Sequence, residues 1–136
     1  MDGAQLCKEI ANLHDSIVSA EIVEKGITIA AYIKSGTLSH LERLFAQTEI
    51  YMSTLQANAE HLGRSHYLLA HNDSTDLFFF PILVNGRKMI LVARASVPYD
   101  YEEIGNYDRY IYPEIISKIW EKINVYRLAE RREQKW

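Results

Sequence analysis

The stretch that decides the fold of this chain is LFFFPILVNGRKMILVA, residues 77–93. Two apolar runs, residues 77–84 and 89–93, flank the dipeptide Asn85-Gly86. Asn-Gly between apolar runs is a strong signal for a β-hairpin, because a type I′ turn needs two residues that tolerate positive φ. Pro81 has no N–H to donate, so we expect its strand to be bent, bulged or at a sheet edge there.

Three further strands are predicted upstream of this hairpin. β-branched residues are enriched in residues 17–23 and 27–33, and Lys25-Gly26 separates these two runs as the turn of another hairpin. A short apolar run, residues 67–70, precedes the polar segment 72–76. The sequence therefore predicts five strands, two of them early and three late.

Three amphipathic helices are predicted from apolar residues spaced three or four apart. A short one covers residues 6–14, and the longest covers residues 38–62, about seven turns, up to Gly63. Pro113 suits the first turn of a last helix with an apolar stripe that ends at Tyr126. The expected class is α+β, with a five-stranded antiparallel sheet flanked by helices in the order α-β-β-α-β-β-β-α.

Size and charge exclude several classes of function. The 136 residues suit one domain, 1–136, with a charged tail over about residues 127–136. A net charge of −3 has the wrong sign for a protein that binds nucleic acid. The longest apolar run is too short to cross a membrane, and the N-terminus lacks the features of a secretory signal. With the single cysteine, Cys7, these features predict a cytoplasmic protein.

The sequence contains no arrangement typical of an active site. Cys7 has no Cys-x-x-Cys or Cys-His partner, and a buried structural cysteine is the expected interpretation. The glycines are isolated and explained by turns or helix ends, so no nucleotide loop is predicted. The histidines lack the spacing of a zinc site; they are His14, His40, His61, His66 and His71. We therefore expect no catalytic residues, no metal and no cofactor.

A tyrosine-rich segment is the first candidate for an interaction site. Tyrosine offers a large contact area and one hydroxyl, and it is enriched in binding surfaces. The alternative is that these rings pack the last helix on the sheet. The tyrosines are Tyr99, Tyr101, Tyr107, Tyr110 and Tyr112.

The long second helix is the other candidate surface. Ile50 and the pair Phe45 and Tyr51 lie outside one narrow apolar face, so a second surface could be buried against a copy of the chain. This pattern predicts a homodimer.

The run IVSAEIVEKGITIA, residues 17–30, resembles the opening hairpin of the roadblock/LC7 family, within the wider longin and profilin-like group. The long second helix and the closing hairpin, residues 77–95, stand in the corresponding places, so the resemblance covers about residues 4–126. It implies dimers that pair the long helix and an edge strand. It also implies a scaffold or regulator of small GTPases and motor complexes, without catalytic residues. The tyrosine-rich segment and the long last helix are not part of a minimal roadblock chain.

The leading hypothesis is therefore a non-catalytic protein-protein interaction module that is dimeric and, as the resemblance implies, linked to a small GTPase. The alternative is a PAS-like or profilin-like domain that holds a small ligand against its sheet, since such sensors share this plan. An enzyme is the third and weaker class. A closed apolar pocket would favour the sensor, whereas a flat self-complementary face would favour the scaffold.

Overall fold

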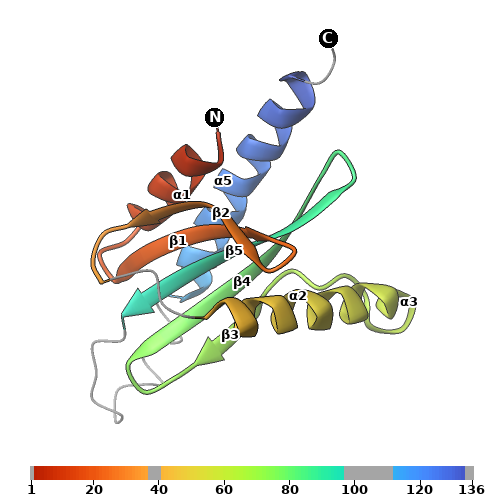
Figure 1. Ribbon diagram of the computed structural model, residues 1–136, viewed down its shortest axis with the longest axis horizontal. Coiled ribbons are helices and arrows are strands. Elements are labelled where there is room, and N and C mark those ends of the chain that lie inside the picture. The colour runs from red at the N-terminus through yellow and green to blue at the C-terminus, as the bar shows by residue number, and fades with distance from the viewer. Residues whose placement is uncertain (1, 37–40, 97–111, 134–136) are drawn as a thin grey trace.

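The computed structural model describes residues 2–36, 41–96 and 112–133 (Figure 1). The helices are α1 (Gly3–Ala11), α2 (Glu42–Ala57), α3 (Ala59–Leu62) and α5 (Tyr112–Glu133). The strands are β1 (Ile17–Glu24), β2 (Ile27–Ile33), β3 (Leu68–His71), β4 (Thr75–Val84) and β5 (Arg87–Ser96). None of the helices in this described part is long and apolar enough to span a lipid bilayer.

The five strands form one antiparallel sheet in the order β2-β1-β5-β4-β3. Two-residue turns join β1 to β2 and β4 to β5, and both residues of each turn have positive φ. Lys25 and Gly26 have φ of 53° and 78°, and Asn85 and Gly86 have φ of 52° and 78°. These are the conformations of type I′ turns, whose twist matches that of the flanking strands. Both predicted hairpins and the α+β fold class are confirmed.

Pro81 lies where β4 becomes an edge of the sheet. β3 pairs with β4 only from Asp76 to Phe79, so in the described part of the chain the remainder of β4 is paired on one side only, with β5. Backbone groups alternate in direction along an antiparallel ladder, and counting from the tight turn places those of Pro81 and Leu83 on the side away from β5. A proline at this position removes no bond of the sheet, which confirms the expected edge position.

Helices α1 and α5 cover one face of the sheet and enclose the larger core (Figure 1). Ile22, Phe80 and Leu91, from three adjacent strands, are buried on this face. The predicted last helix is present with Pro113 in its first turn, and it continues to Glu133. Its buried stripe consists of Ile115, Ile119, Ile123 and Tyr126.

Helix α2 covers the opposite face with only two buried side chains, Phe45 and Met52. The Phe45 ring meets Phe79 of β4 edge-on, with ring centroids 6.1 Å apart. The sheet contributes the rest of this second, smaller core, namely Val23, Leu77, Phe79, Ile90 and Val92. So narrow an apolar contact makes the position of α2 dependent on other interactions.

The β1–β2 turn supplies one such interaction. The carboxylate of Glu49 on α2 accepts hydrogen bonds from the backbone N–H groups of Lys25 (3.0 Å) and Gly26 (2.7 Å). A Cβ at Gly26 would come within 3.2 Å of the Cβ of Ala46, so glycine also lets the turn approach the helix closely. The turn therefore fixes α2 from one flank.

Two helix ends differ from the sequence prediction. The first helix ends at Ala11, not near His14, and Asn12 donates its side-chain and backbone N–H groups to the carbonyl of Lys8. The second helix is not continuous to residue 62, because it ends at Ala57 and a separate short turn, α3, follows. The Asn58 side chain donates to the Thr54 carbonyl at 2.8 Å, and its backbone N–H bonds three residues back. Asparagine competes in this way for helix carbonyls, which explains the interruption.

We predict that Gly26→Ala destabilises the protein more than Gly86→Ala. Both glycines have φ of +78°. Because alanine disfavours this left-handed backbone conformation, each alanine variant should lose about 1 kcal/mol of its free energy of unfolding. Only Gly26 has a close neighbour, and crowding against Ala46 should add about 1 kcal/mol or more. Urea unfolding followed by circular dichroism measures both. Equal losses would show that the turn does not press on α2.

Candidate functional site

One flank of helix α2 carries a mainly apolar stripe that is partly exposed. Leu44, Thr48, Tyr51 and Leu55 follow one another at steps of three or four residues, so they share one side of the helix. Tyr51 is 56% exposed, and Leu44 is exposed as well. The opposite flank holds Ala46 and Glu49 against the β1–β2 turn. The stripe therefore faces away from that turn, toward the β3 side of the sheet.

Strand β3 forms the edge of the sheet on that side. It is last in the strand order, and within the described residues it pairs only with β4. Alternation along the ladder points the N–H and C=O of Leu69 away from β4, and the Leu69 side chain is 39% exposed. An exposed edge strand of this kind can pair with another chain.

The helical stripe and the strand edge lie together. Leu68 and Ala70 of β3 pack against the small core beneath α2, and α2 runs beside β3 in the ribbon (Figure 1). We call the α2 stripe (Leu44, Thr48, Tyr51 and Leu55) and the edge of β3 (Leu68–His71) the α2–β3 face. It combines exposed apolar side chains with the outer backbone groups of a strand, which are the components of a protein-protein interface.

The described structure has the architecture of a known domain type. No family model and no curated protein matches the sequence. Solved structures do match its fold. MglB of Myxococcus xanthus is 12% identical, with a TM-score of 0.58 over 88% of this chain and 89% of that one. A roadblock/LC7 domain from Streptomyces avermitilis is 15% identical, with a TM-score of 0.55 over 93% and 98%. The chain has the roadblock/LC7 fold.

A third structure of this fold is an MglB with a tetrameric arrangement. It is 13% identical to this chain, with a TM-score of 0.55 over 90% of this chain and 88% of that one. At these identities the likeness establishes the roadblock/LC7 fold, as the resemblance of residues 17–30 implied. It does not transfer a function.

The predicted interaction residues occupy different places in this roadblock/LC7 fold. Tyr51 is exposed on the α2–β3 face, whereas Phe45 is buried beneath α2 and presents no surface in the isolated chain. Ile50 is 69% exposed on the other flank of α2. Tyr112 begins α5. The other predicted tyrosines, Tyr99, Tyr101, Tyr107 and Tyr110, lie outside the described residues, so their role stays a prediction.

A buried ion pair beneath α2 is a feature that the sequence analysis missed. Arg94 of β5 donates to Glu21 of β1 at 2.7 Å, and both side chains are almost fully buried. Thr28 donates to the second oxygen of Glu21, and the Arg94 guanidinium lies 5.8 Å from the centroid of the Phe45 ring. Each charge has its partner in the neighbouring strand, and the Arg94 guanidinium also contacts Phe45. The pair therefore links β1, β5 and α2.

We predict that Arg94→Met destabilises the protein by about 3–5 kcal/mol, because it leaves the Glu21 carboxylate buried without its cation. The double variant Glu21→Leu/Arg94→Met should recover most of that loss, since it removes both charges. Chemical denaturation of the three proteins measures the difference. A double variant no more stable than Arg94→Met would contradict this account.

Cys7 is a structural residue of α1. It is buried in the larger core, and burial followed by the negative charge of Glu21 raises its pKa from 9.0 to about 12. A thiol with so high a pKa is almost entirely protonated at neutral pH, and the thiolate is the nucleophile. Within the described residues, no three His, Cys, Asp or Glu side chains gather as metal ligands.

We predict that Cys7 reacts with Ellman's reagent at pH 8 more slowly in the folded protein than in the unfolded chain. The expected difference in rate is on the order of a hundredfold or more. The reason is that both burial and the raised pKa suppress the thiolate. Absorbance in native buffer and in guanidinium gives the two rates. Fast native reaction would show that the thiol is accessible and ionised.

Proposed function

We propose that this chain is a non-catalytic protein-protein interaction module that forms a homodimer through the α2–β3 face. The observation that carries the proposal is the position of Tyr51 and the α2 stripe beside the outer edge of β3. A helix stripe or a strand edge alone is common on protein surfaces. Their juxtaposition offers both side-chain and backbone contacts to one partner.

A two-fold symmetric dimer fits this face well. Two antiparallel copies of β3 can exchange hydrogen bonds through outward groups such as those of Leu69, which extends the sheet across both subunits. The two α2 helices would then lie side by side and bury Leu44 and Tyr51 of each subunit. A two-fold interface is self-complementary, so a single face is sufficient. The tetrameric MglB is a protein of this fold that self-associates.

The family resemblance extends the proposal to the partner. Roadblock-like proteins act as scaffolds or regulators, so we propose a cytoplasmic role with a small GTPase as the candidate partner. The tyrosine-rich segment, residues 99–112, remains the proposed second contact surface. The test is the rate of GTP hydrolysis by a candidate GTPase with and without this protein. Monomeric variants should lose any effect that requires the dimer.

We predict a dimer with twice the monomer mass of 15.8 kDa in sedimentation equilibrium at micromolar concentration. Tyr51→Asp should raise the dissociation constant by about thirtyfold or more, because an interface tyrosine of this kind contributes about 2 kcal/mol. Leu69→Pro should also give monomers, since it removes an N–H that points away from β4 and leaves the β3–β4 pairing intact.

Ile50→Asp is the matched control. It introduces the same charge at an exposed position of the same helix, but on the flank next to the β1–β2 turn. This variant should remain dimeric. A wild-type protein with only the monomer mass, or a loss of the dimer in Ile50→Asp but not in Tyr51→Asp, would refute the proposed interface.

A further inference from the structure

A cleft opens where β4 loses its neighbour β3. Its volume is about 360 Å³, within the range of small-molecule sites. One wall is the C-terminal half of α2, the opposite wall is α5, and the segment that leads into β3 closes the outer side. The side chain of Gln56 on α2 bridges to the carbonyl of Ser65 in that segment at 3.5 Å. The floor is the free edge of β4 at Pro81 and Leu83.

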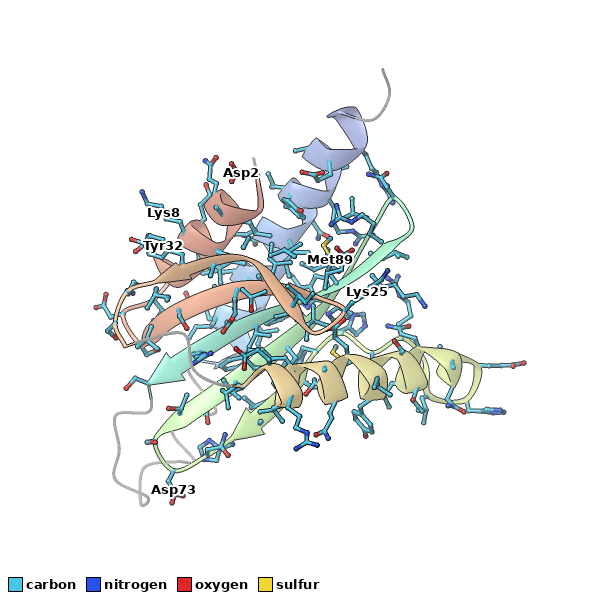
Figure 2. All side chains as sticks on the ribbon, viewed as in Figure 1. Asp2, Lys8, Lys25, Tyr32, Asp73 and Met89 are labelled. Atoms are coloured by element: carbon cyan, nitrogen blue, oxygen red, sulfur yellow. The ribbon has the colours of Figure 1, made fainter. Side chains whose placement is uncertain are left out.

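The cleft is lined by basic side chains from three separate elements. Arg64 precedes β3, Lys88 lies on β5 and Arg127 lies on α5. Met89, the lining residue next to Lys88 on β5, is labelled in Figure 2. Glu49 is the one carboxylate among the described residues of the lining, and it already accepts two backbone hydrogen bonds from the β1–β2 turn. The lining thus carries a net positive charge, although the whole chain has a net charge of −3.

Arg127 carries one donor that the described residues leave without a partner. Its Nε is buried and has no hydrogen-bond partner among them. A buried donor without a partner costs about 1–3 kcal/mol, so an acceptor brought by a ligand would be favourable here.

An aromatic wall stands beside the basic groups. Trp120 of α5 lines the cleft and meets the ring of Phe80 edge-on, with centroids 5.7 Å apart, and that of His66 at 6.3 Å. Met52 and Ile82 add apolar surface. The two contacts fix the plane of the indole, which gives a ligand a rigid surface to pack against.

We propose that this cleft binds a small organic anion, with an apolar or aromatic body beside Trp120 and a carboxylate, sulfonate or phosphate group near Lys88 and Arg127. Charge, size and the aromatic wall select this class together. The site differs from the ligand-binding alternative predicted from the sequence, because it lies at the edge of the sheet and not against its face. It is independent of the proposed dimer.

The test uses anilinonaphthalene sulfonate as the probe. We expect saturable binding, seen as a rise in probe fluorescence and as a shift of the Trp120 indole resonance in a nitrogen-15 spectrum. Lys88→Gln and Arg127→Gln should each raise the dissociation constant by about three- to tenfold, the effect of a partly exposed charge contact. Arg43→Gln, a charge change on an exposed part of α2 outside the cleft, should leave it unchanged.

A neutral analogue, phenylnaphthylamine, separates anion binding from simple apolar adsorption. Equal affinity for the neutral and sulfonated probes would overturn the proposal, as would unchanged binding in both cleft variants or the absence of saturation. Vesicles of phosphatidylglycerol provide a further arm, since Lys88-dependent vesicle binding without probe binding would identify a lipid surface instead. Should Arg127→Gln fail to fold by circular dichroism, Arg64→Gln takes its place. Sedimentation mass is read in parallel and tests the dimer separately.

Discussion

The arrangement of the α2–β3 face and the cleft depends on the hydrogen bonds from the β1–β2 turn to Glu49. Helix α2 has only Phe45 and Met52 fully buried, and two apolar anchors on one line leave a helix able to roll about its axis. A carboxylate held at two points on the flank removes that freedom. Because the turn is a type I′ turn with Gly26 against Ala46, its N–H groups can reach the helix without a side chain in between.

With the roll of α2 fixed, its two flanks acquire different roles. One flank faces the turn, and the other presents Tyr51 beside β3. The end of the helix, near Gln56, forms a wall of the cleft. The short strand β3 contributes to both surfaces. Its outer side is an edge of the sheet. Because its pairing with β4 does not extend beyond Phe79, the rest of the β4 edge forms the floor of the cleft. One short strand thus shapes both proposed surfaces.

The parts of this structure that local sequence encodes could be predicted. Asn85-Gly86 and Lys25-Gly26 determine their turns within a few residues, so both hairpins and the order of the strands along the chain could be predicted from local sequence. Helix periodicity placed Phe45 and Tyr51 on α2, but it could not show which was buried, since that depends on where the sheet lies. The cleft could not be predicted from the sequence either, because its basic residues come from segments that are far apart in the chain. The break at Asn58 had a local signal, an asparagine inside a long helix, which the apolar pattern outweighed.

The Glu21–Arg94 pair explains why a sheet with such apolar strands adopts one register. Glu21 and Arg94 are 73 positions apart in the sequence, so no local pattern reveals their contact. Side chains alternate between faces, and a slip of one residue between β1 and β5 would turn one of the charges toward the α1–α5 core, among Ile22 and Leu91. An unpaired charge there costs several kcal/mol, whereas the observed register pairs both charges beneath Phe45. The central register in turn sets where β4 and β3 lie, so a buried pair with no chemistry of its own determines where the outer face is presented.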